Sequence, residues 1–352
     1  MLICSDLRRA ALAIVCALFC LPGVAGAASD KVLRVLAWPG YADPEAVSSF
    51  EKKTGSRVEV TQIDSDDVLW QRVAANGGAD FDVFAVNTAE LARYIDASLV
   101  AVLDLSRIPN SKLQLPRFRE VAKVPGIVRR NNLHAVPYTY ADMGLIYDKK
   151  TFPVAPDSIA VMWDSRYRGK VLAYDGGTHN FSLAALKNGA RNPFRIASAD
   201  WRMLSAELIA LRRNVLGFYS QPDESLKLYQ QGKAVLLFAN YGSQQVQAFR
   251  NAGLDVGYVI PREGALAWLD CWAIIAKTPQ RALAEEWINH MLEPAVSALL
   301  VSRQGLSSTL AVTPGNEQAL LHWLQPPEDV EKRSLLWKRI ISGDRLEKVI
   351  AP

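Results

Sequence analysis

Cysteine is scarce in this sequence, and its distribution excludes a disulfide framework. The chain has four cysteines in 352 residues, and Cys4, Cys16 and Cys20 all lie near the N-terminus. Only Cys271 lies in the body of the chain. A free cysteine usually packs as a small buried hydrophobe, so we expect Cys271 in the core.

Charge of one sign is also scarce. The formal net charge is +4, and no run of lysines and arginines is long enough to follow a phosphate backbone. We therefore expect no nucleic-acid partner. Half of the residues are hydrophobic, which is typical of a globular protein, and the length exceeds that of one average domain.

The sequence has no apolar run near the roughly 18 residues that a membrane-spanning helix needs. A shorter run, residues 10–21, follows Arg8 and Arg9 and precedes the small residues that end at Ala27. This order is typical of a secretory signal peptide, so residues 1–27 are predicted to be removed. We expect an exported protein without stable membrane insertion.

Common catalytic motifs are missing as well. The sequence contains no G-x-S-x-G, no P-loop, no G-x-G-x-x-G and no H-E-x-x-H. His134, His290 and His322 show no metal-ligand spacing with one another or with Cys271. We therefore predict no catalytic residues, metal site or cofactor. A binding protein is favoured, and a secreted hydrolytic enzyme is the less favoured alternative.

The chain does contain regular alternation of strands and helices, which predicts an α/β fold with a parallel sheet. The first predicted helix has Asp43 as its N-cap, Pro44 at its first position and Gly55 at its end. Strands are predicted over 31–38, 57–61, 81–86, 138–147, 170–174, 234–238, 256–260 and 264–276. Further helices are predicted after 64–66 and over 88–94, 199–211 and 281–291.

One predicted strand, residues 264–276, carries a carboxylate between two indoles. Trp268, Asp270 and Trp272 alternate along it and therefore point to one face. Burying an unpaired charge costs roughly several kcal/mol. The partner could be a basic side chain from elsewhere in the chain, or an organic cation that also contacts the indole faces.

Polar and aromatic residues follow other predicted strands at their carboxyl ends, where α/β sheets bind ligands. Trp38 and Tyr41 follow the first strand, and Asn87 and Thr88 follow the third. Exposed aromatics at a strand–helix turn are poor core residues, which favours ligand contact at Trp38 and Tyr41. Tyr138 lies on a long crossing segment, where ligand contact and packing are about equally expected.

Together these residues resemble the spermidine/putrescine-binding proteins, the periplasmic receptors of polyamine ABC importers. The resemblance covers the mature chain, and its motifs include Trp38-Pro39-Gly40-Tyr41, Phe81-Asp82-Val83, Ala135-Val136-Pro137-Tyr138, Tyr167-Arg168-Gly169-Lys170, Tyr241-Gly242-Ser243 and Trp268-Leu269-Asp270. It implies a type II periplasmic binding protein fold, with two α/β lobes joined by crossing strands and the ligand cleft between them. It also implies a periplasmic monomer that needs no cofactor and partners the permease and ATPase of an ABC importer.

The lobe boundaries that follow from the resemblance are 28–139 with 271–312 for the first lobe, and 140–270 with 313–352 for the second. The C-terminal helices are expected to pack across the second lobe.

This sequence departs from the family where the family places two further carboxylates. Gly176 and His179 occupy those two places in the loop after the strand ending at Tyr174, although Asp175 directly precedes Gly176. We therefore predict a ligand with one amine at Asp270 and a less cationic distal end. It is a short diamine if Asp175 supplies a carboxylate, and otherwise an amino-acid-like or monocationic solute near His179. The predicted ligand-binding residues are Trp38, Tyr41, Asn87, Thr88, Tyr138, Asp175, His179, Tyr241, Trp268 and Asp270.

Overall fold

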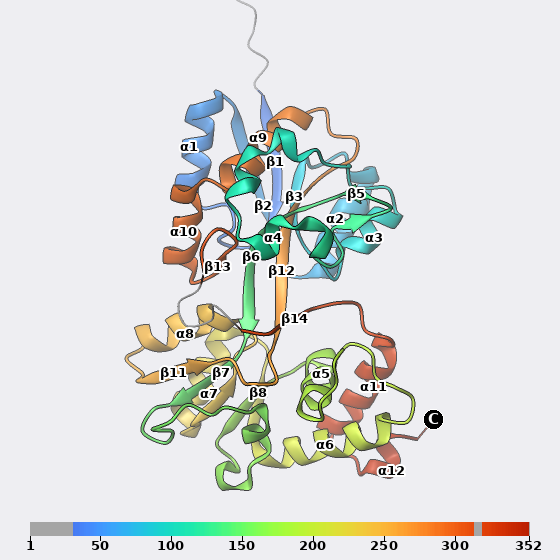
Figure 1. Ribbon diagram of the computed structural model, residues 1–352, viewed down its shortest axis with the longest axis vertical. Helices are drawn as coiled ribbons and strands as arrows, with labels where there is room; N and C mark the ends of the chain where they lie inside the picture. Colours follow the sequence, from blue (N-terminus) through green and yellow to red (C-terminus); the bar gives the residue numbers. More distant parts are fainter. Residues whose placement is uncertain (1–30, 313–318, 352) are drawn as a thin grey trace, which may run out of the picture.

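The computed structural model describes residues 31–312 and 319–351, and the predicted signal peptide lies outside them. The chain forms two lobes, one above the other in Figure 1. Strands β6 (Val136–Met143) and β12 (Ala265–Ile274) run together from one lobe to the other (Figure 1). They pair with each other in antiparallel register.

The first lobe is built on a seven-stranded sheet in the order β13-β6-β12-β3-β1-β2, with β14 beside β12. β1 pairs in parallel with both β2 and β3, which confirms the parallel pairing predicted there. The other strands of this sheet are β1 (Val32–Ala37), β2 (Arg57–Gln62), β3 (Val83–Asn87), β13 (Ser307–Ser308) and β14 (Leu321–Trp323), and a separate hairpin joins β4 (Val128–Arg129) to β5 (Asn132–Leu133). The helices of this lobe are α1 (Pro44–Thr54), α2 (Asp66–Ala74), α3 (Leu91–Asp96), α4 (Pro116–Arg119), α9 (Arg281–Met291) and α10 (Pro294–Gln304).

Local signals determine where α1 begins and ends. The Asp43 side chain accepts a hydrogen bond from the amide of Glu45, and Pro44 is the first helical residue. Gly55 adopts a left-handed conformation with φ of 67° and donates to the carbonyl of Glu51. A residue with a Cβ is strained in that conformation, so the glycine ends the helix. The predicted bounds of α1 are confirmed.

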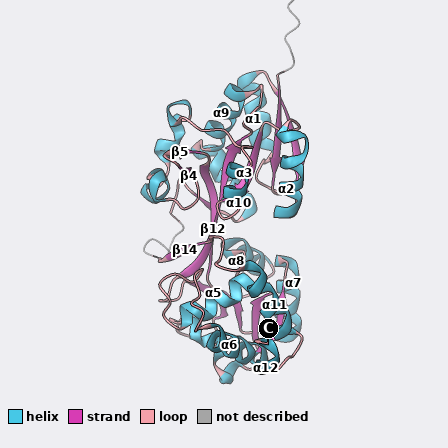
Figure 2. Ribbon diagram, turned by 90° about the vertical axis from the view of Figure 1, so that its right-hand side faces the viewer, coloured by secondary structure: helices cyan, strands magenta, loops and turns pink. Residues whose placement is uncertain are grey.

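The second lobe is built on a five-stranded sheet in the order β11-β7-β10-β8-β9. Its strands are β7 (Leu145–Asp148), β8 (Val171–Tyr174), β9 (Val215–Tyr219), β10 (Leu236–Phe238) and β11 (Val256–Val259). Its helices are α5 (Gly177–Lys187), α6 (Trp201–Asn214), α7 (Pro222–Gly232), α8 (Gly242–Asn251), α11 (Val330–Ile341) and α12 (Leu346–Val349). In the perpendicular view of Figure 2, helices flank the strands of both lobes. β9 was not predicted, because it follows α6 without an intervening turn signal.

The segment predicted as one strand over 138–147 is divided at Gly144 into β6 and β7. A Cβ at Gly144 would lie 2.5 Å from the carbonyl oxygen of Val259, at the end of β11 (Val256–Val259), so the backbone there approaches too closely for a larger residue. The amide of Gly144 donates to the Tyr258 hydroxyl at 2.9 Å, and that hydroxyl donates to the Asp142 carboxylate at 2.6 Å. Tyr258 of the second lobe therefore fixes the point at which β6 enters it.

The C-terminal helix α11 packs on the second lobe, against α5 and α6. Arg333 is fully buried there and forms an ion pair with Glu328 at 2.8 Å. It also donates to the Ser182 hydroxyl and to the carbonyl oxygens of Thr178 and Pro193. Every one of these contacts ties α11 or its approach to the region around α5. Among residues 31–312 and 319–351, no helix is long and apolar enough to cross a membrane.

Candidate functional site

The candidate site is centred on Asp270 in the middle of β12. Asp270 pairs with Asn87 across the β12–β3 ladder, so the end of β3 lies directly beside the carboxylate. β1 lies beside β3 in the sheet, and Tyr41 lies in the turn that follows β1. The sheet therefore brings together three of the predicted residues that are far apart in sequence.

Two neutral donors hold the Asp270 carboxylate. The Tyr41 hydroxyl donates to Oδ2 at 2.5 Å, and the Asn87 side-chain amide donates to Oδ1 at 3.0 Å. Asp270 is only 6% exposed, and in the part of the chain that the structure describes no basic side chain forms an ion pair with it. The interpretation in which an internal arginine or lysine neutralises Asp270 is therefore wrong for the described residues.

Burial changes the acidity of this group. It raises the pKa of Asp270 to about 6, although the hydrogen bonds from Tyr41 and Asn87 act in the opposite direction by stabilising the carboxylate. At neutral pH the side chain is therefore a buried anion that neutral donors only partly compensate. Such an environment favours a ligand that brings a positive charge.

Trp272 does not belong to the ligand site, although it was predicted to share a face with Asp270. Its ring is fully buried and packs edge-on against Trp287 of α9 and at a tilt against Tyr138. Alternation along a strand gives the face of a side chain but not its depth, and Trp272 lies deeper in the first lobe. Trp272 is a core residue.

Tyr138 lies behind Tyr41. The two rings meet edge-on with centroids 5.8 Å apart, and the Tyr138 hydroxyl donates to the Tyr41 carbonyl oxygen at 3.0 Å. Tyr138 is 2% exposed. This packing orients Tyr41 toward Asp270, so the structure gives Tyr138 a supporting position.

Three other predicted residues of the first lobe lie close to this centre along the chain. Trp38 ends β1, and its indole Nε1 is buried without a hydrogen-bond partner among the described residues. Thr88 follows Asn87, and its buried hydroxyl has no partner there either. Trp268 is partly buried and packs against the hydrophobic cores of both lobes. These groups have hydrogen-bonding or aromatic surface that the described residues do not use.

The second lobe contributes an aromatic edge at the end of β8. Tyr174 packs against His179 with ring centroids 5.0 Å apart, and against Tyr241 with centroids 6.2 Å apart. Burial, together with the nearby positive charge of Arg333, lowers the pKa of His179 to about 4. His179 is therefore a neutral imidazole at physiological pH. Tyr174 was not predicted as a site residue, although its position at the end of a strand was a usable signal.

Asp175 is engaged away from this aromatic edge. Its Oδ1 accepts a hydrogen bond from the indole of Trp337, on α11, at 2.7 Å, and the residue is exposed. Trp337 therefore holds the carboxylate that was considered as a replacement for the family's missing ones.

A different carboxylate, Asp66, was missed. It is the first residue of α2, and its Oδ1 is buried without a hydrogen-bond partner in the described chain. Burial raises the pKa of Asp66 to about 7. The sequence Asp64-Ser65-Asp66 was interpreted only as a helix start, and Ser65 is indeed the N-cap.

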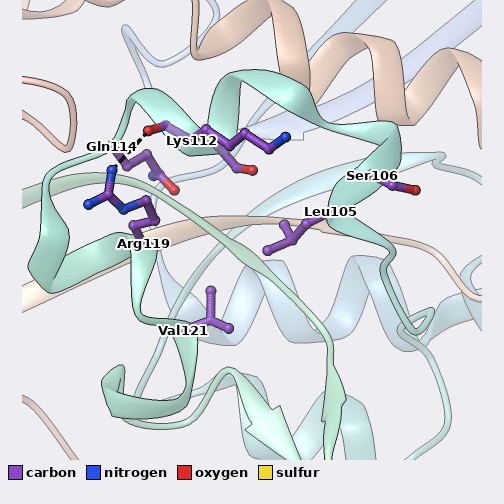
Figure 3. Close-up of a pocket in the computed structure, with 7 residues that line it drawn as sticks. Leu105, Ser106, Lys112, Gln114, Arg119 and Val121 are labelled. Carbon is purple, nitrogen blue, oxygen red and sulfur yellow. Dashed lines mark hydrogen bonds between the residues drawn. The ribbon is translucent and has the colours of Figure 1, made fainter.

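Figure 3 shows a pocket on the first lobe whose lining includes none of the predicted site residues. Arg119 donates to the carbonyl of Lys112 there, and the Gln114 amide donates to Pro137 and Thr309. The pocket is lined by Leu105, Ser106, Ser111, Lys112, Gln114, Arg119 and Val121. Its polar groups are thus largely used within the protein.

Within residues 31–312 and 319–351, no three histidine, cysteine or acidic side chains gather as a metal site.

Comparison with known proteins places this geometry in a family. Residues 45–321, more than half of the chain, match the family of bacterial extracellular solute-binding proteins. The chain belongs to that family. It is 25% identical to the putrescine-binding periplasmic protein PotF of Escherichia coli, over 90% of this chain and 93% of PotF. It is 27% identical to the putrescine-binding periplasmic protein SpuD of Pseudomonas aeruginosa, over 88% of each chain.

The fold of this solute-binding protein is also that of a solved relative. The spermidine/putrescine ABC transporter substrate-binding protein PotD of Streptococcus pneumoniae aligns with a TM-score of 0.74 and 20% identity, covering 91% of this chain and 99% of that one. The predicted family and the predicted two-lobed α/β fold are confirmed. The residues predicted to bind ligand stay predictions.

Proposed function

We propose that this solute-binding protein is the periplasmic receptor of an ABC importer and that it captures a small organic cation of the polyamine class. The observation that carries the proposal is Asp270, a buried carboxylate held by Tyr41 and Asn87 without a described basic partner. The names of PotF and SpuD support the ligand class.

The chemistry of the site fits an alkylammonium group. A carboxylate whose two oxygens already accept hydrogen bonds keeps further lone pairs for the N–H groups of a ligand. The aromatic rings of Trp38 and Trp268 are available for the adjoining methylene groups and for cation–π contact, worth about 0.5–2 kcal/mol. A neutral solute would leave the buried charge of Asp270 uncompensated.

The same proposal covers processing and partners. Residues 1–27 are removed on export, the mature chain works as a monomer, and it delivers its ligand to a permease with an attached ATPase. The lobes comprise 28–139 with 271–312, and 140–270 with 313–352, so Asp270 lies at the boundary, on strand β12 of the first-lobe sheet. N-terminal sequencing of the exported protein should give a start at or near Ala28, whereas a start at Met1 in a cytoplasmic fraction would contradict export.

The decisive experiment is a thermal-shift screen of the mature protein against polyamines, diamines, amino acids and betaines, followed by calorimetry. A ligand that binds the native state raises the unfolding temperature. Asp270→Asn should weaken amine binding by at least roughly tenfold, about 1.4 kcal/mol. Cys271→Ala, which changes the neighbouring side chain on the opposite face, should change affinity by less than about twofold. Tight amine binding by the Asp270→Asn variant would show that Asp270 does not bind the ammonium group of the ligand.

Binding without turnover separates the receptor from the enzyme alternative. The ligand should be recovered chemically unchanged after long incubation with the protein. Ligand should also draw the lobes together, because it favours the state that contacts it from both sides. Small-angle scattering at saturation should then give a smaller radius of gyration, and an unchanged profile would indicate a rigid site.

A further inference from the structure

Asp66 lies at the same edge of the first-lobe sheet as Asp270's donors. β1 lies between β2 and β3, so the chain segments that leave the three strands emerge side by side. After β2, the amide of Ile63 still donates to the carbonyl of Ala37 at 3.1 Å, which keeps this segment beside the end of β1. Helix α2 then begins at Asp66. Asp66 therefore stands next to the turn that holds Trp38 and Tyr41.

The Asp66 carboxylate has little compensation from the described residues. Its Oδ1 is buried and accepts no hydrogen bond from them. The nearby Arg93 pairs with Glu90 at 3.1 Å and donates to the main-chain oxygen of Asp66 rather than to its carboxylate. The Arg93 guanidinium also lies over the Trp70 ring, 5.0 Å from its centroid. Arg93 thus directs its hydrogen bonds to groups other than the Asp66 carboxylate, and its buried Nε has no partner among the described residues.

Electrostatics places Asp66 within range of both lobes. Burial raises its pKa to about 7, and the negative charges of Glu90, Asp270 and Asp67 raise it as well, while Arg93 opposes them. The charge of Asp66 in turn adds to the burial that raises the pKa of Tyr41 in the first lobe and of Tyr174 in the second. The charge of Asp66 therefore acts on titratable groups of both lobes.

Two further buried atoms at these edges are also without partners in the described chain. Thr88 is 4% exposed and follows β3, and its hydroxyl makes no hydrogen bond. Asn240 is 7% exposed and lies just beyond β10 in the second lobe, and its side-chain oxygen accepts none. Buried polar groups are almost always satisfied in folded proteins. A polar ligand that reaches the ends of β3 and β10 would satisfy both groups.

We infer that Asp66 is a second ligand-binding carboxylate and that the ligand is a short α,ω-diamine, with one ammonium group at Asp270 and the other at Asp66. The inference rests on the proposed function. At the edge of the second lobe, the Asp175 side chain is exposed and accepts a hydrogen bond from Trp337, and His179 is neutral, so the more desolvated carboxylates are Asp270 and Asp66. A monocation would compensate one of the two carboxylates and leave the other without a cation, whereas a diamine compensates both.

The test compares two ligands that differ by one ammonium group, putrescine and butylamine, by calorimetry on the mature protein. Asp66→Asn keeps the size and removes the charge, and it should weaken putrescine binding by at least roughly tenfold while changing butylamine binding by less than about threefold. Asp67→Asn is the matched control, because Asp67 is the next residue of α2 and is exposed. It should change neither affinity by more than about twofold. Asp270→Asn should weaken both ligands.

A second readout is the proton count. A diamine that neutralises Asp66 lowers its pKa, so binding near pH 7 should release protons, measured as a dependence of the binding enthalpy on the buffer. Asp66→Asn should reduce that release, and Asp67→Asn should not.

The outcomes separate the inference from the proposed function. If Asp66→Asn binds putrescine as tightly as the unaltered protein while Asp270→Asn does not bind it, the inference is wrong and the proposed function stands. If the unaltered protein binds neither amine, the proposed function fails. Equal affinity of the unaltered protein for putrescine and butylamine would also overturn the inference.

Discussion

The two lobes present opposite chemistry at the candidate site. The edge of the first lobe holds two carboxylates, Asp270 and Asp66, with few compensating groups among the described residues. The edge of the second lobe holds the rings of Tyr174 and Tyr241 and a neutral His179. The difference suggests a division of labour in which the first lobe selects for positive charge and the second encloses the hydrocarbon part of the ligand.

The C-terminal helix contacts the polar residues of the second lobe at this edge. Trp337 of α11 holds the Asp175 carboxylate, and Arg333 of the same helix donates to the carbonyl of Thr178 in the first turn of α5. The positive charge of Arg333 also helps to keep His179 neutral. The contrast between the lobes therefore depends on α11, and a variant of this helix is the first test of it.

The largest effect is expected from Arg333→Leu. This change breaks a buried ion pair and removes the hydrogen bonds that Arg333 donates to Glu328 and to the carbonyl groups of Thr178 and Pro193, so the free energy of unfolding should fall by about 3–5 kcal/mol. Urea denaturation measures this loss. Lys338→Met on the exposed side of α11 is the control and should change stability by less than about 0.5 kcal/mol. A similar loss in both variants would argue against a specific role of Arg333.

Asp270→Asn should stabilise the ligand-free protein, although it removes the carboxylate that is proposed to bind the ammonium group. The pKa of Asp270 is raised to about 6 in the folded state, so the folded protein binds this proton more tightly than the unfolded chain. Stability is therefore lost as pH rises from about 4 through 6, and the asparagine variant should be more stable by on the order of 1–3 kcal/mol at pH near 7.5.

The same variant should have no advantage below the unfolded-state pKa of about 3.9. Urea denaturation of both proteins across this range, without ligand, measures the difference. If the asparagine variant were the less stable protein at neutral pH, the carboxylate would be structural rather than functional.

Tyr41→Phe tests how strongly the hydrogen bond from Tyr41 stabilises the charged form of Asp270. The Tyr41 hydroxyl donates to Asp270 and stabilises its charged form, so removing it should raise the pKa of Asp270 further. Amine affinity should then fall by about 1 kcal/mol near pH 6.5 and recover at higher pH, where the carboxylate is ionised anyway. Calorimetry at several pH values shows the shift. Tyr138→Phe is the control, because that hydroxyl donates to a main-chain oxygen instead.

The smallest effect is expected from Asp175→Asn. Asp175 is exposed, and its carboxylate is hydrogen-bonded to Trp337 on α11. The affinity for putrescine should therefore change by less than about threefold, or 0.7 kcal/mol, in the same titrations. A tenfold loss would show that the second lobe does supply a charge to the ligand, and the contrast between the lobes would then fail.

Local signals in the sequence were sufficient for much of the fold. The bounds of α1 follow from Asp43, Pro44 and Gly55, whose effects act within one turn of the helix. The centre of the site was predictable for a similar reason, because the ends of strands and the alternation along 264–276 are visible in one dimension. The order of the strands in the sheet then brings Asn87 and Tyr41 to Asp270.

Depth and direction were not predictable from such patterns. Trp272 shares a face with Asp270 but is covered by Trp287, a residue of a helix that no strand pattern can locate. Asp66 was not predicted as a site residue, because acidic residues are common at the start of a helix and its position there already explained it. Only the tertiary structure shows that its carboxylate is buried without a described partner.

The position of Asp270 on a strand that runs between the lobes has a mechanical consequence. β6 and β12 pair along the crossing, and Gly144 with Tyr258 fixes the place where β6 enters the second lobe. Any rotation of one lobe against the other must bend these two strands, so Asp270 lies close to the fulcrum. A ligand that pulls on this residue works on a short lever arm, and the far ends of the lobes travel much further than the ligand itself. A small movement at Asp270 would therefore appear as a larger change in the distance between the far ends of the lobes.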